Sequence, residues 1–473
     1  MINRKNIFII IGPILFGILY FLLPENIFPT SEARAAVGTL AWMAFWWVTS
    51  PVDAAVVGFL PIGLNAIFQM TKMSDVISSY SSETILLLLG SMILTISWEE
   101  TGLDNRIAIK FMSLVGNNFK KQIIFWFCIS AFLSAFIPNV VVCATIVPIA
   151  VSMLRYVGEG DIAKSKVGSL LLLTIVYAVG IGGLASPLGG AMNLITVNYL
   201  EQLTNQEYML SAWILRFAPI MLVLLVSNIL FLLVVSRKCK LNCQTKEYFA
   251  EQYKALPKIT REEILSLIIF LVSVILAFTR QLYQEILPGL KPAYVFIIAA
   301  IIIFVINKKD GTRLMKWKSV QQKLHLDLLY VFAGGIALGT LINNTGAASN
   351  IGDLAIKLNI DGGIVTVFII VLFTVLLSDI TSNTATAAVA IPLVISIIEG
   401  IGKNPIPYIY IATIGINVSY MLPTSIRAIP VGYGLEPKYM LKKGIPLTII
   451  VIILMTIVGY LLMKFWPLFS TTI

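Results

Sequence analysis

The sequence predicts an all-α polytopic membrane protein, and its composition, its long apolar runs and an internal repeat each support this fold class. Of the 473 residues, 58% are hydrophobic and only 12% are charged, and the mean hydropathy is +0.90. A soluble protein could not bury so much apolar surface, whereas membrane-spanning helices leave it facing lipid. The first apolar run lacks a prompt small-residue cleavage site, so we predict an uncleaved first span rather than a signal peptide.

Eleven apolar runs are long enough to cross a bilayer, which takes roughly 20 residues per helix. The predicted spans are 7–23, 32–48, 51–69, 84–99, 167–203, 210–235, 264–280, 293–307, 328–343, 405–433 and 444–466. Mixed polarity in 103–118 and 347–360 is typical of amphipathic helices that lie in the membrane interface. The predicted architecture therefore has horizontal helices as well as spanning ones.

Two further apolar stretches, 122–155 and 363–398, are interrupted by polar clusters around Asn139 and Asn383. We interpret both as re-entrant helical hairpins with the polar residues at their tips. Each hairpin then returns to the side of the membrane from which it entered, and full crossings instead would scatter the basic loops over both sides.

The positive charge supports this topology. The net charge is +10, and the basic residues lie in short loops between apolar runs rather than in the patch that nucleic-acid binding requires. With the hairpins re-entrant, most Lys and Arg fall in loops on one side, which identifies that side as cytoplasmic. The N-terminus is then cytoplasmic and the C-terminus external, with the loop at 236–263 inside.

An internal repeat divides the chain into two halves. "IPNVVVCATIVP" aligns without gaps with "TSNTATAAVAIP" at an offset of 244 residues, which pairs Asn139 with Asn383 and Ser134 with Ser378. The first copy begins inside and the second outside, so the halves are inverted. Inverted repeats with interrupted helices near the bilayer midplane are typical of secondary transporters.

Each half also contains a helix broken by Gly or Pro. "GIGGLASPLGGAMN" matches "INVSYMLPTSIRAI", with Pro187 opposite Pro423. The backbone groups freed by such breaks must be satisfied inside the protein or at a cavity. "GIGGLA" also fits a dinucleotide-binding fingerprint, but that motif needs a preceding strand in a βαβ unit, which this sequence does not predict.

The polar tips are the candidate binding site. Helix N-termini present free N–H groups and the positive end of the helix dipole, which favour anions. Ser382, Asn383 and Thr384 add donors at one tip and Asn139 adds one at the other, so a pair of tips suits a ligand with two carboxylates. The alternative is that these side chains only hold helices together by hydrogen bonds, and it applies most strongly to Ser134.

Arg427 is the second candidate, because a charged group inside the membrane is costly and usually functional. It lies in the second broken helix, and its guanidinium fork suits a carboxylate. Two structural alternatives are an ion pair with Asp379 and a side chain that extends to the interface.

At these residues the sequence resembles the divalent anion/sodium symporter family, the INDY-type carriers of dicarboxylates and citrate. "SNTATAAVAIP" is similar to the family's Ser-Asn-Thr signature, and "GGLASPLGGAMN" and "MLPTSIRAIP" are similar to its two companion motifs. The resemblance implies a homodimer that works as an elevator, with a scaffold at 1–121 and 210–361 and a transport unit at 122–209 and 362–473. It also implies the following substrate-binding residues: Asn139, Val140, Ser382, Asn383, Thr384, Gly189, Gly190, Thr424, Ser425 and Arg427.

Two departures from the family pattern concern sodium. Pro138-Asn139-Val140 stands where the family has Ser-Asn-Thr, and Ile426-Arg427 stands where it usually has Thr-Pro. The first change removes an expected sodium ligand, and the second adds a fixed positive charge. We therefore predict sodium-independent exchange of C4 and C5 dicarboxylates, namely succinate, malate, fumarate and oxoglutarate. The alternative is a sodium-coupled dicarboxylate or citrate symporter, with Ser134 and Ser378 as candidates for a residual cation site.

Other classes of function receive less support. A membrane enzyme would need a catalytic motif, and the chain has one His and neither H-E-x-x-H nor G-x-S-x-G. An ion channel would need a continuous pore rather than two closed hairpins. Cys239 and Cys243, spaced C-x3-C in a basic loop, are weak evidence for a metal, and Cys128 and Cys143 are predicted to pack as small residues. No cofactor or metal is expected.

Overall fold

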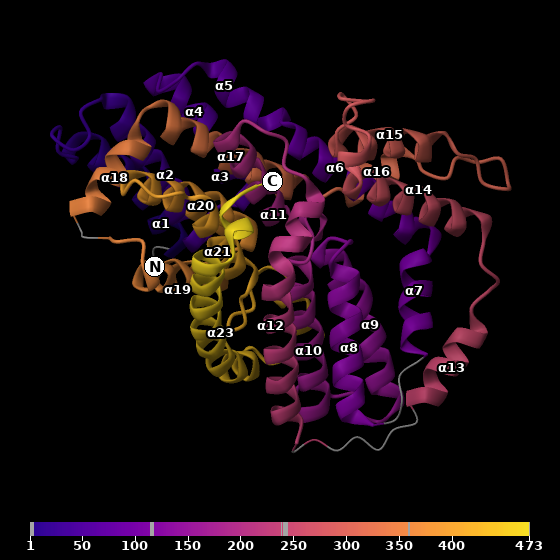
Figure 1. Cartoon of the computed structure of the whole chain (residues 1–473). Coiled ribbons are helices and arrows are strands. Elements are labelled where there is room, and N and C mark those ends of the chain that lie inside the picture. Colours follow the sequence, from indigo (N-terminus) through magenta and orange to yellow (C-terminus); the bar gives the residue numbers. More distant parts are fainter. Residues whose placement is uncertain (1–3, 114–117, 238, 240–244, 358–359, 473) are drawn as a thin grey trace.

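The computed structural model describes residues 4–113, 118–237, 239, 245–357 and 360–472. Cys243 and part of the loop at 236–263 lie outside the described residues. Within them all the regular secondary structure is helical, and the one β-type pairing is an isolated bridge between Asn307 and Arg313 (Figure 1). The predicted all-α fold class is confirmed.

The first block of helices begins with two that pack against each other. Its helices are α1 (Arg4–Leu22), α2 (Ser31–Thr49), α3 (Ala54–Val57), α4 (Leu60–Phe68), α5 (Met73–Ser78), the 3₁₀ turn η1 (Ser79–Ser81), α6 (Glu83–Thr101) and α7 (Leu103–Met112). Thr30 caps α2 by accepting from the N–H of Ala33. Gly102, with φ of 76°, ends α6 and turns the chain into α7.

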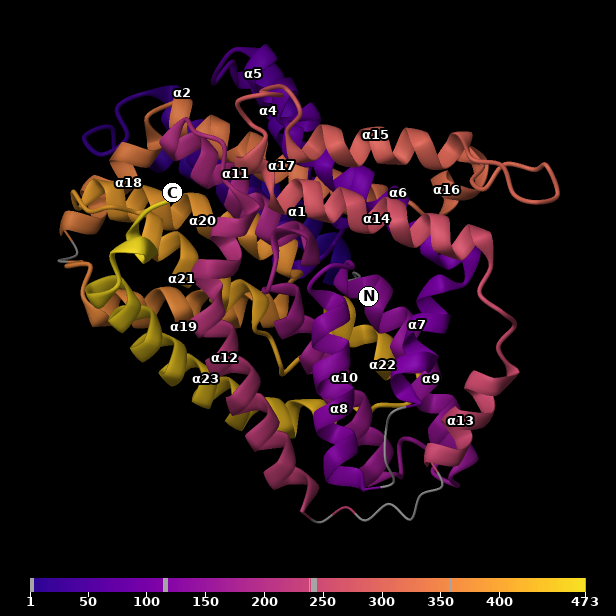
Figure 2. The same ribbon diagram turned by 45° about the vertical axis from the view of Figure 1, so that its right-hand side comes forward.

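The polar cluster around Asn139 interrupts the next block, as the sequence predicts. It contains α8 (Phe119–Ser134), α9 (Asn139–Tyr156), α10 (Lys166–Gly183), η2 (Pro187–Gly189) and α11 (Ala191–Thr204). Helices α8 and α9 pack against each other and against α10, and Figures 1 and 2 both place the three side by side. The Gly- and Pro-rich segment forms the break between α10 and α11.

The third block runs from the long helix α12 to the short helix α18. It contains α12 (Leu210–Ser236), α13 (Thr245–Ala255), α14 (Arg261–Phe278), η3 (Arg280–Leu282), α15 (Pro292–Val305), α16 (Trp317–Lys323), α17 (Leu326–Asn344) and α18 (Ala347–Lys357). Thr260 and Glu263 form a capping box at α14. Arg106 Nε lies 2.6 Å from Glu263 Oε1, which ties α7 to α14.

The last block repeats the pattern of an interrupted pair followed by a broken helix. It contains α19 (Ile364–Ile380), α20 (Asn383–Gly400), α21 (Ile406–Asn417), η4 (Ser425–Arg427), α22 (Ala428–Gly432), α23 (Pro437–Phe465) and η5 (Pro467–Ser470). Helices α19 and α20 pack against each other and against α21. Pro423 lies in the non-helical segment between α21 and η4.

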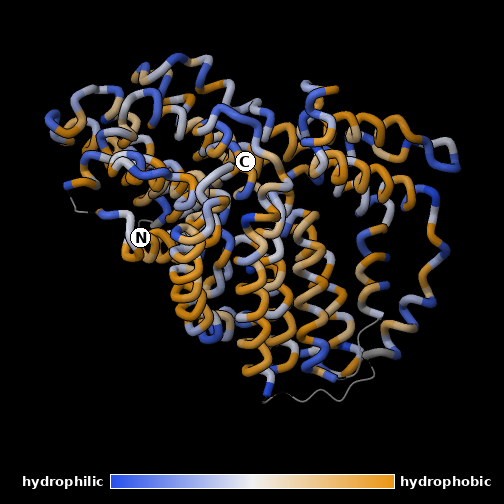
Figure 3. Tube along the Cα trace, in the orientation of Figure 1, coloured by the Kyte–Doolittle hydropathy of each residue, from blue (hydrophilic) through white to orange (hydrophobic). Residues whose placement is uncertain are grey.

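Eight helices in the described part of the chain are long and apolar enough to cross a membrane, and four shorter apolar helices accompany them. Figure 3 shows that hydrophobic residues predominate along the long helices in the lower part of the view. The chain is therefore a multi-pass membrane protein. Two of the eight, Asn139–Tyr156 and Asn383–Gly400, are halves of the predicted hairpins, so the number of eleven spans stays a prediction.

Helix α17 lets its neighbours approach closely because it is rich in glycine. A Cβ added at Gly335 would lie 2.3 Å from Ala388 Cβ of α20, and one at Gly339 would lie 2.2 Å from the hydroxyl oxygen of Tyr199 on α11. The Tyr199 hydroxyl donates to the Gly335 carbonyl at 3.0 Å. Helix α17 thus packs directly on α11, which follows the break in "GGLASPLGGAMN", and on α20, which begins within "SNTATAAVAIP".

Candidate functional site

The tip of the first hairpin is attached to the broken helix beside it. Ser134 ends α8 and Asn139 begins α9. The Ser134 hydroxyl lies 2.6 Å from Asn139 Oδ1 and 2.8 Å from the Val179 carbonyl of α10. One serine therefore holds the orientation of the tip asparagine and joins the tip to α10.

The second tip is built in the same way. The Ser378 hydroxyl lies 2.9 Å from Asn383 Oδ1 and 2.7 Å from the Ile416 carbonyl of α21. Ser378 and Asn383 are the residues that the repeat alignment pairs with Ser134 and Asn139. This duplicated arrangement supports the inverted repeat, which remains a proposal.

Both tip asparagines have donors left for a ligand. Their amide oxygens are occupied by serine hydroxyls, and the hydrogen bonds of the described residues assign no acceptor to either amide nitrogen. The first N–H groups of α9 and α20 also lack partners within their own helices. Asn139 is 7% exposed and Asn383 is 5% exposed, so an anion bound there would be largely removed from water.

The two tips differ where the sequence departs from the family signature. Ser382 caps α20 by accepting from the Ala385 N–H at 3.1 Å. Pro138 occupies the equivalent place before α9, and no side chain caps that helix. Val140 is partly buried and offers no hydroxyl, whereas Thr384 is buried at the second tip. The second tip is therefore richer in hydroxyl groups.

Glycines allow the first tip to lie against the break between α10 and α11. A Cβ at Gly183 would lie 2.4 Å from Asn139 Oδ1. A Cβ at Gly189 would lie 2.3 Å from the Gly183 carbonyl oxygen and 2.7 Å from the Ser134 carbonyl oxygen. Because the two oxygens that face Gly189 are backbone atoms, neither can move aside without shifting the chain.

We expect Gly189→Ala to displace the first tip, with a cost of about 1–3 kcal/mol from overpacking. Transport should fall and the melting temperature should drop. Gly63→Ala is the matched control, since a Cβ there meets nothing within 4 Å. Unchanged transport in Gly189→Ala would show that the contact between tip and break is not needed for binding.

Arg427 is enclosed by oxygen atoms of the second tip and its neighbouring loop. Its Nε donates to the Leu422 carbonyl at 2.7 Å, and its Nη atoms donate to the carbonyls of Ser378 and Ser419 and to the hydroxyls of Ser419 and Thr424. All the guanidinium N–H groups are thus engaged by five protein oxygens. We call these five oxygens the oxygen cage.

The surroundings of Arg427 match neither of the two structural alternatives, an interfacial side chain or an ion pair with Asp379. At 2% exposure it does not extend to an interface, and the ion pairs of the described residues do not include it with Asp379. Asp379 acts on it only as a neighbouring charge. Because its donors are already used, Arg427 serves in this conformation to bind the loop to the tip, and its contact with substrate stays a prediction.

Two residues that contribute oxygens to the cage, Ser419 and Leu422, were not predicted from the sequence. Ser419 and Leu422 belong to the segment before Pro423, whose only signal was that proline. Asp379 fixes the same segment by accepting from the Met421 N–H at 2.8 Å, and its carbonyl accepts from the Thr424 hydroxyl at 3.0 Å. Two consecutive residues at the end of α19 thus supply acceptors to this region: the Ser378 carbonyl accepts from Arg427, and Asp379 accepts from the loop before η4.

The remaining predicted residues lie around these contacts. Gly190 follows η2 at the first tip, and Ser425 is exposed at the second with φ of 51°. The two halves meet behind the tips, where Asn417 Nδ2 donates to Asn193 Oδ1 at 2.9 Å and Thr196 bonds to Thr413 at 2.8 Å. The structure thus brings each tip to its own broken helix and joins the broken helices to each other.

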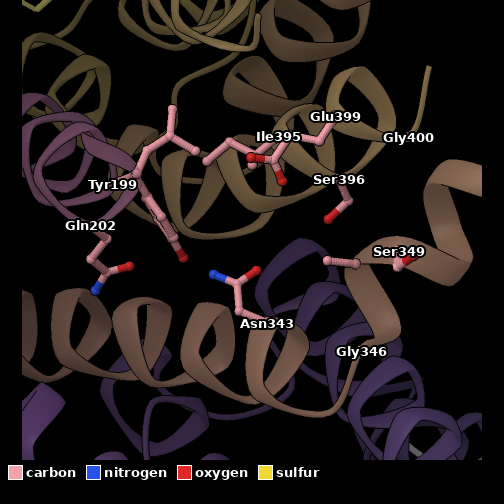
Figure 4. A pocket seen from close by; sticks show the side chains of 11 residues that line it. Tyr199, Gln202, Asn343, Gly346, Ser349, Ile395, Ser396, Glu399 and Gly400 are labelled. Carbon is pink, nitrogen blue, oxygen red and sulfur yellow. The ribbon is translucent and has the colours of Figure 1, made fainter. Parts of the chain in front are cut away.

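A separate cavity lies away from the two tips. About 530 Å³ of space opens between α11, α17, α18 and α20, and Figure 4 shows Tyr199, Asn343, Ser396 and Glu399 along its wall. Glu399 is the one charged residue of this lining, so the cavity suits a dianion poorly. None of the predicted substrate residues lines it, and nothing in the sequence signalled it.

The fold and the paired tips define an all-helical membrane transporter, and two solved transporter structures share the fold. YdaH from Alcanivorax borkumensis aligns with a TM-score of 0.54 at 12% identity, covering 86% of this chain and 90% of that one. MtrF from Neisseria gonorrhoeae, described as one of a class of antimetabolite efflux pumps, aligns with a TM-score of 0.56 at 13% identity, covering 94% and 96%.

The chain belongs to the citrate transporter family, whose model matches residues 44–415. It is 26% identical to the sodium-dependent dicarboxylate transporter SdcS of Staphylococcus saprophyticus and 29% identical to SdcS of Staphylococcus aureus; each alignment covers 96% of this chain and 90% of the relative. The resemblance to the divalent anion/sodium symporters is confirmed. The protein is a transporter and not an enzyme.

Proposed function

We propose that this protein exchanges C4 and C5 dicarboxylates across the membrane without sodium. The substrate class rests on the relatives, which are named dicarboxylate transporters, and on the citrate transporter family. Succinate, malate, fumarate and oxoglutarate fit a site that receives one carboxylate at each tip. The two amide nitrogens and the helix N-termini supply the donors, and hydrogen bonds to a charged group contribute about 1.5–3 kcal/mol each.

The oxygen cage around Arg427 carries the proposal of sodium independence. Carbonyl and hydroxyl oxygens are the ligands that hard metal cations take in proteins. Here five such oxygens surround a guanidinium that is covalently part of the chain. A protein charge therefore occupies the kind of place where a bound cation would lie. At the first tip, Pro138 and Val140 contribute no hydroxyl ligand.

An exchanger differs from a uniporter in that its transport unit changes sides slowly when no substrate is bound. Arg427 itself supplies little of this barrier, because five protein oxygens satisfy its guanidinium N–H groups without a substrate. The unfilled donors at the two tips supply a barrier instead. Each buried donor left without an acceptor costs about 1–3 kcal/mol, and bound dicarboxylate removes that cost in both directions.

Sodium-coupled symport is the second candidate, and the relatives' name, sodium-dependent dicarboxylate transporter, favours it. Ser378 and Asn383 would then retain a cation site at the second tip, and Ser134 and Asn139 one at the first. The two candidates share the fold and substrate class, and differ in whether sodium accelerates transport.

We also propose the elevator arrangement, with a homodimer of fixed scaffolds that flank moving transport units. The packing of α12 favours one change of boundary: it lies against α8, α10 and α23 and makes fewer contacts with α14. In the proposed arrangement α12 therefore moves with 122–209, and the transport unit's first part extends to about residue 236. The glycine-rich face of α17 would be the surface on which α11 and α20 slide.

The proposed topology gives a direct prediction. In a background with all four cysteines replaced by serine, a cysteine at Glu251 on α13 should be protected from an impermeant maleimide in intact cells, because its loop is cytoplasmic. A cysteine at Lys403 should be labelled, because its loop is external. The opposite pattern would overturn the re-entrant hairpins and the orientation of both termini.

Counterflow in proteoliposomes tests exchange and substrate class together. Vesicles loaded with unlabelled succinate should take up labelled succinate, malate, fumarate or oxoglutarate in sodium-free buffer, and empty vesicles should take up little. Equal uptake by loaded and empty vesicles would exclude exchange, and trans-stimulation by monocarboxylates alone would exclude the two-carboxylate site.

A further inference from the structure

A cluster of cations lies at the end of α15, away from the candidate site. The segment 306–318, which we call the basic hairpin, contains Lys308, Lys309, Arg313, Lys316 and Lys318 against one acid, Asp310. All but Lys308 are exposed, and none of the five takes part in an ion pair among the described residues. The Glu262 carboxylate of α14 also lies here and accepts from the Lys309 backbone N–H at 3.0 Å, and Arg313 donates to the Val305 carbonyl. The five cations still outnumber the two acids, Asp310 and Glu262, so the cluster keeps a net positive charge for a ligand.

The basic hairpin is held in place rather than free in solvent. The Lys308 N–H donates to the Thr312 carbonyl at 2.7 Å, and the Leu314 N–H donates to the Ile306 carbonyl at 2.8 Å. Leu314 and Met315 are each 2% exposed and anchor it. The carboxylate of Asp310 accepts hydrogen bonds from Thr312, so the hairpin's own acid is directed to its turn.

An apolar groove lies beside the basic hairpin, along helix α15. Helices α14 and α15 enclose a groove of about 220 Å³, lined along its outer edge by the exposed side chains Ile268, Val272, Ile298 and Ile302. Figure 3 shows both helices as hydrophobic along their length and the loop after α15, at the right edge, as hydrophilic. Ile302 is one turn from Val305, where α15 ends, so the groove leads towards the basic hairpin.

We propose that the groove and the basic hairpin together bind one anionic phospholipid. An acyl chain lies in the groove between α14 and α15, and the phosphate headgroup is held by the hairpin's lysines and arginine. Trp317, which is 56% exposed beside these cations, suits the headgroup level of a bilayer. The geometry thus combines an apolar slot with opposite charge at its end, as an anionic lipid requires.

A second copy of the chain is a poorer occupant of this face. In a dimer whose twofold axis is normal to the membrane, both basic hairpins lie at the same depth. Packing two copies through α14 and α15 would bring their unpaired cations together, and like charges in contact oppose association. A lipid neutralises the same cations.

The test uses the purified full-length protein, stripped of lipid in detergent and titrated with phosphatidylglycerol or phosphatidylcholine while bound lipids are counted by native mass spectrometry. The wild type should bind one phosphatidylglycerol saturably and prefer it to phosphatidylcholine. The double variant Lys309→Gln/Lys316→Gln should weaken this binding by roughly 20- to 30-fold, because each basic residue near the surface contributes about fivefold. Lys438→Gln/Lys442→Gln removes the same charge elsewhere and should leave binding unchanged.

The groove has its own pair of variants. Val272→Trp fills it and should weaken phosphatidylglycerol binding, whereas Leu271→Trp, exposed on the same helix but outside the groove, should not. Equal binding of the two lipids, or equal loss in the two lysine doubles, would overturn the proposal in favour of unspecific annular lipid. A lipid-free dimer that Val272→Trp dissociates would overturn it in favour of an interface between copies.

Discussion

Asn383→Ala is expected to abolish dicarboxylate transport while leaving a folded protein. The substitution removes the amide nitrogen that we assign to a substrate carboxylate, and a hydrogen bond to a charged group is worth about 1.5–3 kcal/mol, or roughly ten- to a hundredfold in affinity. It also removes the acceptor that lies 2.9 Å from the Ser378 hydroxyl, so the second tip loses its fixed orientation. Uptake kinetics and a binding titration with succinate would measure both effects.

A control separates this effect from a general loss of stability. Asn344→Ala changes the same side chain at the exposed end of α17, where its amide bonds to Thr71 and Asp75, and it should transport normally. Size-exclusion profiles of the two variants should match the wild type. Normal transport kinetics in Asn383→Ala would remove this residue from the site.

Arg427→Ala is expected to have the second large effect, because it empties the oxygen cage. Five oxygens lose their donor, and the buried carboxyl group of Asp379 loses a neighbouring cation. Such losses cost about 3 kcal/mol or more, so we expect a lower melting temperature and at least a tenfold loss of exchange in sodium-free buffer. If the guanidinium stands in for a cation, added sodium should restore part of the activity, since the cage offers oxygen ligands.

Two further variants make this result interpretable. Arg427→Lys keeps the charge but has three donors on one atom, so it cannot reach all five oxygens and should be partly active at best. Arg155→Ala, on the exposed end of α9, should behave as wild type. Normal sodium-free exchange by Arg427→Ala would refute the charge-substitution idea and favour a cation-coupled cycle.

The sequence predicted the interruptions of the helices better than the contacts that these interruptions make. Polar residues within apolar runs located the breaks before Asn139 and Asn383, because such groups cannot face lipid in a continuous helix. The repeat also paired Ser134 with Ser378, and the structure gives both serines the same two partners. Periodicity and composition therefore sufficed for the class of fold and for the position of the tips.

The hydrogen-bond partners of Arg427 could not be predicted from periodicity or composition. Its acceptors come from the tip of α19 and from the loop before η4, and no spacing rule states which carbonyls a folded loop will direct at a side chain. The sequence suggested a substrate carboxylate or Asp379 as the partner of Arg427, whereas the fold surrounds its guanidinium with carbonyl and hydroxyl oxygens. The cavity beside Glu399 was missed for a similar reason, because it forms where four helices that are distant in sequence meet.

The most direct measurement is the initial rate of succinate exchange by the wild-type protein in preloaded proteoliposomes as sodium replaces choline on the outside. A chain in which the Arg427 guanidinium takes the place of a bound cation should give the same rate at every sodium concentration. An inward sodium gradient should then drive no net uptake into empty vesicles. A rate that rises and saturates with sodium, or accumulation driven by the gradient, would contradict the proposed mechanism and identify the protein as a sodium-coupled symporter.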